Sequence, residues 1–229
     1  MKQEKLIWGY KELFAILLLI LVAVPIIIEN IGQRIFQDIF QNNLYAGTLT
    51  GLIMAVVFMC GLYLIVLKPK QLKWVAIGLK PFPRSDWKVI VGGFLLLFVM
   101  SIIILFIMDV MKIGIDNSKT EALKDESTWF TFSIAFISAA IISPIYEEIL
   151  YRGFLYKWFR LRWGKVLGIL LSSLIFMIVH IPTYNTLPVN FVSGVILAWT
   201  YEKSGSIMPG IIIHGLFNGI AVILTTMSF

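Results

Sequence analysis

The sequence predicts an all-α membrane protein, a polytopic bundle of about seven transmembrane helices. Three observations predict this class: 59% of the 229 residues are hydrophobic, only 14% are charged, and the mean hydropathy is +0.90. A soluble globular domain carries about 25% charged residues, so this chain has too little polar surface to cover itself in water. We expect one integral membrane domain over residues 1–229.

The composition also argues against other classes of protein. The chain has a single cysteine, Cys60, which excludes a disulfide-stapled scaffold. The net charge of +6 would suggest a nucleic-acid partner in a soluble protein, but membrane proteins collect basic residues in their cytoplasmic loops. We therefore expect no nucleic acid, and a lipid bilayer as the surroundings of the chain.

Apolar runs of near-spanning length recur along the chain, and a helix needs about 20 residues to cross the hydrocarbon core. The seven candidate spans are residues 13–28, 45–67, 89–108, 129–159, 166–181, 187–201 and 207–227. The first span follows a basic flank but lacks a small-residue cleavage site, so we interpret it as a retained helix. Spans five and six are short, and a link with two prolines at 182–188 joins them.

Lys and Arg concentrate in alternate loops, and this pattern predicts the orientation. The amino-terminal flank and the loops 68–88 and 160–165 carry most of the 19 basic residues. Because basic loops stay in the cytoplasm, we expect a cytoplasmic amino terminus and, with seven spans, a carboxyl terminus outside. Loop 68–88 also holds Trp74, Phe82 and Trp87, which are typical of the membrane interface. An excess of Lys over Arg and many Ile residues suggest an AT-rich bacterial genome. We therefore expect the protein in a bacterial cell membrane.

Few ionisable side chains fall inside the spans, and such groups usually mark function. They are Glu147, Glu148 and Arg152 in span four, His180 in span five, and His214, with Asn218 beside it, in span seven. We estimated the depth of each group in the membrane from the number of residues between it and the nearest cytoplasmic charge on its helix, at a rise of about 1.5 Å per residue. The groups then lie at similar depths inside the core. We therefore expect a site buried between spans four, five and seven.

The spacing within span four predicts different roles for its two glutamates. Glu148 and Arg152 are four residues apart, with the acid on the amino-terminal side, and are expected to form an ion pair. Glu147 is rotated by about 100° from Glu148. It is the freer carboxylate and therefore the candidate general base.

The same spacing recurs in the two later spans. Phe176 precedes His180 by four residues, so its ring can form a wall beside the imidazole. His214 and Asn218 are also four apart and present two polar groups on one helix face. Two such groups could donate hydrogen bonds to an oxyanion.

Three motifs in this order resemble the CPBP family. They are E-E-x-x-x-R at 147–152, F-x-x-x-H at 176–180 and H-x-x-x-N at 214–218. The family groups CAAX prenyl endopeptidases with bacteriocin-processing and immunity proteins, also called Abi proteins. The resemblance covers roughly residues 142–219, which would be the catalytic half of the chain.

The resemblance implies an intramembrane glutamic endopeptidase. In the prenyl-protein proteases of the CPBP family, the first glutamate and the first histidine are taken to activate water. The resemblance implies this role for Glu147 and His180. The second histidine and the asparagine, here His214 and Asn218, would stabilise the oxyanion. Glu148 and Arg152 would support the site. The expected activity is hydrolysis of a peptide bond in a membrane-associated peptide or protein, in bacterial peptide processing, maturation or self-immunity.

Other functions stay open at this point. No cofactor is expected, but Glu147, His180 and His214 could together hold zinc in a metal-dependent membrane protease. The helical zinc motif H-E-x-x-H is absent from the sequence. The intramembrane acid and imidazole groups could also belong to an ion or proton transporter, or to a scaffold without activity.

Overall fold

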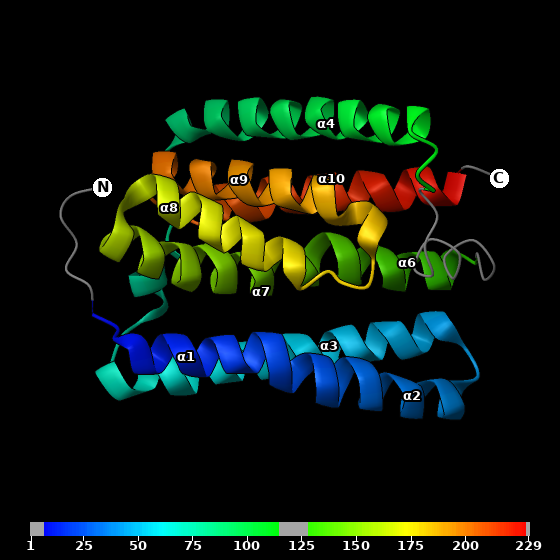
Figure 1. Ribbon diagram of the computed structural model, residues 1–229, viewed down its shortest axis with the longest axis horizontal. Coiled ribbons are helices and arrows are strands. Elements are labelled where there is room, and N and C mark those ends of the chain that lie inside the picture. Colours follow the sequence, from blue (N-terminus) through cyan, green and yellow to red (C-terminus); the bar gives the residue numbers. More distant parts are fainter. Residues whose placement is uncertain (1–6, 115–127, 228–229) are drawn as a thin grey trace.

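Every regular element among the described residues, 7–114 and 128–227, is a helix, which confirms the all-α prediction. The helices of this computed structural model lie side by side in layers (Figure 1). Five segments are long and apolar enough to cross a membrane: Tyr10–Phe40, Asn43–Lys70, Arg84–Val110, Trp129–Ile178 and Met208–Met227. The protein is therefore a multi-pass helical membrane protein, while the count of seven spans stays a prediction.

The first helix is longer than the span predicted at 13–28. It consists of α1 (Tyr10–Leu18), the π-helix η1 (Leu19–Gly32) and α2 (Gln33–Phe40). Pro25 lies inside η1, where the wider π-helical turns accommodate a residue that has no backbone N–H to donate. The helix therefore continues past Ile28, and Glu29 lies within it.

The second helix packs beside the first, and together they form the lowest layer in Figure 1. It consists of α3 (Asn43–Leu62), the π-helix η2 (Tyr63–Leu67) and the 3-10 turn η3 (Lys68–Lys70). Asn42 caps the start of α3, because its side chain accepts a hydrogen bond of 2.8 Å from the backbone N–H of Tyr45. The indole of Trp8 donates to the carbonyl of Val66 and so ties the start of the first helix to the end of the second.

The segment that was predicted to lie at the membrane interface is anchored to the centre of the bundle. It contains the 3-10 turns η4 (Trp74–Ile77) and η5 (Arg84–Asp86). Ile77 is fully buried, and Gly153 comes so close that a Cβ atom on this glycine would lie 2.8 Å from the Ile77 carbonyl oxygen. Lys157 donates to the carbonyl of Ala76 over 2.8 Å. Trp87, by contrast, is exposed, as expected of an interfacial anchor.

The apolar segment Trp129–Ile178 folds back on itself. Its elements are α6 (Trp129–Ile137), the π-helix η6 (Ser138–Ile142), α7 (Ser143–Glu147), the π-helix η7 (Glu148–Tyr156) and α8 (Lys157–Ile178). Gly164 breaks the helical geometry with φ 86° and ψ 175°, a conformation that glycine adopts most readily. The chain reverses there, so that the rest of α8 returns beside η7 (Figure 1). This reversal separates the regions predicted as spans four and five.

Three further helices form the upper part of Figure 1 and pack against one another. They are α4 (Trp87–Val110), α9 (Leu187–Ser204), which follows the 3-10 turn η8 (Tyr184–Thr186), and α10 (Met208–Met227). Helix α9 also packs on α8, and it is not among the five apolar segments. Its buried face carries Ser193, Gly194 and Thr200. Small residues of this kind allow close contact between helices in membranes.

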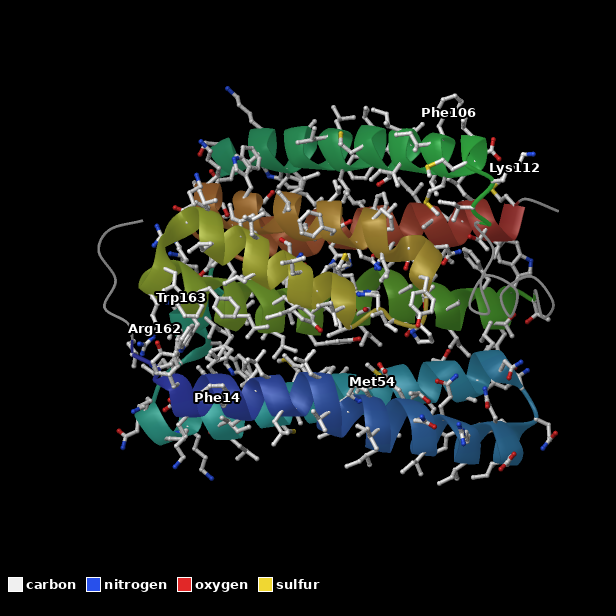
Figure 2. All side chains as sticks on the ribbon, in the orientation of Figure 1. Phe14, Met54, Phe106, Lys112, Arg162 and Trp163 are labelled. Carbon is white, nitrogen blue, oxygen red and sulfur yellow. The ribbon has the colours of Figure 1, made fainter. Side chains whose placement is uncertain are left out.

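The outer faces of the bundle are apolar, and one end is rich in aromatic and basic side chains. Figure 2 shows Phe106 projecting from α4 away from the other helices, and this side chain is 67% exposed. Near the reversal, the guanidinium of Arg162 lies 4.2 Å from the ring centre of Tyr10 and 4.6 Å from that of Trp158. Aromatic and basic residues at this end fit a membrane–water interface.

A polar cluster at the same end joins the reversal to α9. Arg160 donates to both carboxylate oxygens of Glu202, over 2.5 and 2.9 Å, and the hydroxyl of Tyr156 donates to Glu202 over 2.6 Å. Burial alone would raise the pKa of Glu202, but these two donors hold the pKa below its ordinary value. The carboxylate is therefore ionised near neutral pH and fixes Arg160 beside the end of α9.

The positions of the helix ends lead to a prediction of topology. Helix α1 begins at the same end of the bundle as the reversal at Gly164, whereas α10 ends at the opposite end (Figure 1). Because basic loops stay in the cytoplasm, we expect reporter fusions to place residues 68–88 and 160–165 in the cytoplasm. A fusion after Met227 is expected to report the outside, and a cytoplasmic signal there would contradict the predicted odd number of passes.

Candidate active site

Two adjacent glutamates lie where α7 meets η7, near the centre of the bundle. Glu147 is 8% exposed and Glu148 is fully buried. Every residue of η7 is buried, so protein surrounds this part of the helix. Carboxylates in such surroundings require hydrogen-bond donors or opposite charges, and the two glutamates have different partners.

Glu148 and Arg152 form the buried ion pair that their spacing predicts. Nη1 of Arg152 lies 2.7 Å from Oε1 of Glu148, and the two side chains are 1% and 0% exposed. The guanidinium also lies 4.4 Å from the centre of the Phe176 ring, in a cation–π contact. Its Nη2 donates to the carbonyl of Gly194 over 3.4 Å. The ion pair therefore connects η7 to both α8 and α9.

His214 on α10 reaches both carboxylates. Its Nδ1 lies 3.0 Å from Oε1 of Glu148, and its Nε2 lies 3.7 Å from Oε2 of Glu147. Glu148, already bound to Arg152, can only accept, so Nδ1 of His214 carries a hydrogen.

The second oxygen of Glu148 faces the first turn of α10. This Oε2 atom is buried and has no hydrogen-bond partner among the residues that the structure describes. It lies beside Gly210, where a Cβ atom would come within 2.9 Å of it. The amino-terminal turn of a helix carries a partial positive charge that favours a carboxylate. Gly210 therefore allows Glu148 to approach the favourable end of α10.

Glu147 has a partner that the sequence analysis did not identify. The hydroxyl of Ser143, one turn earlier, donates to Oε1 of Glu147, while Oε2 faces His214. Glu148 is thus held by a guanidinium and Glu147 by a hydroxyl. The spacing of four residues between Ser143 and Glu147 is the sequence signal that could have revealed this contact.

His180 lies just outside the helix that the sequence analysis assigned to it. Helix α8 ends at Ile178, and His180 belongs to the turn that follows. Its Nδ1 lies 2.6 Å from the carbonyl oxygen of Phe176, which can only accept. The hydrogen is therefore on Nδ1, and Nε2 carries the lone pair of the neutral ring. The Phe176 ring lies 4.8 Å from the His180 ring and 5.9 Å from the His214 ring, so it contacts both imidazoles.

Asn218 lies one turn beyond His214 on α10 and is bonded to η6. Its Nδ2 donates to the carbonyl of Ala139 over 3.0 Å. One further N–H remains on this nitrogen, because an amide group has two. His214 was expected to act with Asn218 as a donor. Its Nδ1 is engaged by Glu148, so His214 can contribute only through Nε2.

The structure thus brings the predicted site residues together, but their contacts differ from one residue to the next. Contacts link six of them around Phe176 and His214, and Asn218 joins through η6. Within residues 7–114 and 128–227, no group of three or more His, Cys, Asp or Glu side chains is arranged to hold a metal ion.

Glu29 is a further carboxylate near the site that the sequence analysis missed. It lies on η1, within the first membrane helix, and is partly buried. It interacts electrostatically with the side chains of Tyr146 and Tyr151, which flank the two glutamates. The predicted end of span one at Ile28 placed Glu29 in a loop, whereas it lies within the continuous first helix.

An apolar groove of about 400 Å³ runs alongside the site, between the η6–α7 region and α10. Its lining residues are Phe136, Ala140, Ile141, Ile145, Ile211, Ile212, Gly215, Leu216, Gly219, Ile220 and Ile223. Gly215 and Gly219 directly follow His214 and Asn218 in the sequence. The groove thus runs along the helix that carries His214 and Asn218, although neither of these two side chains lines it.

Comparison with known proteins agrees with this site. Residues 129–220 match the family described as type II CAAX prenyl endopeptidase Rce1-like. The matched segment contains all seven predicted site residues, and it confirms the family resemblance of the motifs. No curated protein and no solved structure gives a significant match. Residues 7–114 lie outside the matched segment.

The buried ion pair leads to a prediction about stability. Glu148→Gln or Arg152→Met is expected to lower the free energy of unfolding by about 3–5 kcal/mol, because each leaves an uncompensated buried charge. Glu147→Gln keeps the size and the acceptor for Ser143, so its cost is expected to stay below about 1 kcal/mol. Thermal unfolding of the purified variants in one detergent compares them. Equal losses for Glu147→Gln and Glu148→Gln would contradict the difference between the two glutamates.

Proposed function

Because residues 129–220 match the CAAX prenyl endopeptidases of the Rce1-like type, we propose that the protein is an intramembrane endopeptidase. It hydrolyses a peptide bond by direct attack of a water molecule, with Glu147 as the general base. One observation carries this proposal. Nε2 of His214 and Oε2 of Glu147 are 3.7 Å apart, which is too long for a direct hydrogen bond and suits a shared water.

The proposed reaction uses the polar groups as follows. Glu147 accepts a proton from the water as the water oxygen attacks the scissile carbonyl carbon. Nε2 of His180, which carries a lone pair, assists by accepting a hydrogen bond from the same water. The oxyanion accepts hydrogen bonds from Nε2–H of His214 and from the second N–H of Asn218. Glu147 then returns the proton to the leaving amine, and the peptide bond breaks.

The proposed substrate is a membrane-associated peptide or protein. The groove beside His214 and Asn218 is lined by apolar residues, so an apolar or lipid-bearing segment could lie there while its peptide bond enters the site. We propose roles in bacterial peptide processing, maturation or self-immunity. Peptides that accumulate in cells carrying Glu147→Gln instead of the wild-type protein would identify the substrates.

The decisive test of this function is proteolysis by the purified protein in liposomes. The probes are a farnesylated fluorogenic peptide that ends in a CAAX sequence and the same peptide without the lipid. Glu147→Gln is expected to lower kcat by about 10²–10⁴-fold, since a general base is lost. Asp38→Asn, which changes an exposed carboxylate on α2, is the matched control and is expected to keep the wild-type rate.

Two outcomes would contradict the proposed function. One is an unchanged rate for Glu147→Gln, which would remove this residue from the chemistry. The other is a wild-type protein that cleaves neither probe and leaves cellular peptides unchanged, but carries protons or ions across the liposome membrane. That result would favour a transporter built on the same intramembrane groups.

Hydrolysis is expected to need no metal ion. The positive charge of Arg152, 2.7 Å from Glu148, disfavours a divalent cation at this site. Nδ1 of His214 is engaged by Glu148 as well. Exhaustive chelation followed by the liposome assay is therefore expected to leave the rate unchanged, with elemental analysis as the parallel measurement. Stoichiometric zinc whose removal abolishes activity and whose return restores it would contradict the water-activating glutamate.

A further inference from the structure

Several hydroxyl side chains in the helices of this protein follow one common pattern. Six of them donate to a carbonyl oxygen one turn earlier in their own helix, as serine and threonine ordinarily do in membrane helices, whereas the buried hydroxyls of Ser101 and Thr200 have no hydrogen-bond partner among the described residues. The pairs are Thr50 with Ala46, Ser133 with Trp129, Ser172 with Gly168, Ser173 with Ile169, Ser204 with Thr200 and Thr226 with Val222, over 2.7–3.0 Å.

Ser143 departs from this pattern. Its hydroxyl donates forward, to Oε1 of Glu147 one turn later. The carbonyl one turn earlier belongs to Ala139, and this oxygen already accepts the amide of Asn218 from α10 over 3.0 Å. A carbonyl oxygen has two lone pairs, so Asn218 occupies one of them and competes with Ser143 for this acceptor, and the hydroxyl points toward the carboxylate.

The forward bond fixes the plane of the Glu147 carboxylate. With Oε1 held by Ser143, Oε2 faces Nε2 of His214 across the 3.7 Å gap. If Ser143 bonded backward, the Glu147 side chain would lose this restraint and rotate more freely about its last torsion angle. A general base must lie within hydrogen-bond reach of the proton that it abstracts.

We propose that Ser143 is a positioning residue for Glu147 and that Asn218, by competing for the Ala139 carbonyl, favours this role. The kinetic consequence of this positioning role rests on the proposed endopeptidase function, whereas the hydrogen bond from Ser143 to Glu147 does not. The site is thereby coupled across helices: α10 supplies Asn218, and the effect reaches the base through η6 and α7.

Tyr146 makes a weaker contribution to the same arrangement. Its hydroxyl oxygen lies 3.5 Å from Oγ of Ser143, which is long for a hydrogen bond between hydroxyls. The Tyr146 hydroxyl also forms a side-chain hydrogen bond with Glu147 itself. The Tyr146 ring packs against Phe58 of α3, so its position also depends on the amino-terminal layer.

The test compares Ser143→Ala, Ser143→Thr and the matched control Ser133→Ala, in which a backward-bonded serine of the same helical run is removed. Infrared spectra of the purified protein give a carboxylate band for Glu147, identified as the band that disappears in Glu147→Gln. We expect this band to shift in Ser143→Ala, and to keep its wild-type position in Ser143→Thr and Ser133→Ala. An unshifted band in Ser143→Ala would overturn the proposal.

The kinetic arm uses the farnesylated CAAX-type peptide in liposomes. Ser143→Ala is expected to lower kcat by about 10–100-fold, the worth of one hydrogen bond to a charged group, with KM within about twofold. Ser143→Thr should restore most of the rate. A higher KM with an unchanged kcat would overturn the positioning role. So would a loss of rate that Ser143→Thr does not rescue. If the wild-type protein cleaves nothing, the endopeptidase function fails, and the infrared arm still decides the contact of Ser143.

Discussion

Two opposite charges, on Glu148 and Arg152, lie 2.7 Å apart near the centre of an apolar helical bundle, and the rest of the site is arranged around them. Burying such a pair is costly unless every partner is in place. The partners come from three other helices: the Phe176 ring from α8, the Gly194 carbonyl from α9 and the imidazole of His214 from α10. The pair therefore fixes the relative positions of the helices that carry the predicted catalytic residues.

This constraint also explains why glycines occur where the helices meet. A Cβ atom on Gly194 would come within 2.8 Å of Ser173, so the glycine allows α9 to lie against α8 with its carbonyl facing Arg152. Gly210 has the same function on α10, where it makes room for the second oxygen of Glu148. The adjacent Glu147 has a different set of partners, the Ser143 hydroxyl and the His214 ring. A hydroxyl restrains it, and its other oxygen stays available for chemistry.

Local patterns in the sequence predict the parts of this site that lie within one helix. Apolar runs predict the helices, and the spacing of four residues predicts both the Glu148–Arg152 pair and the contact of Phe176 with His180. These predictions succeed because the geometry of a single helix fixes which side chains are neighbours. The family match covers residues 129–220, the part of the chain that contains these motifs.

Contacts between helices could not be predicted in this way, because no spacing rule relates residues far apart in the chain. The approach of His214 to Glu148 and the bond from Asn218 to Ala139 depend on how α10 packs. Helix ends were also misplaced. The first helix continues through Pro25 in a π-helical form, which brings Glu29 into the helix, and α8 ends before His180. The forward bond of Ser143 lies within one helix, whereas the bond from Asn218 to the carbonyl one turn before Ser143 comes from another helix.

The most direct test of this account is a double-mutant cycle on the buried pair. It compares the free energies of unfolding of Glu148→Gln, Arg152→Met and the double variant in the same detergent. Because each single change strands a partner that the double change removes, we expect the double variant to be more stable than the sum of the two losses predicts, by at least about 1 kcal/mol. Losses that simply add would show that the two charges do not stabilise each other, and would contradict the claim that their pair organises the site.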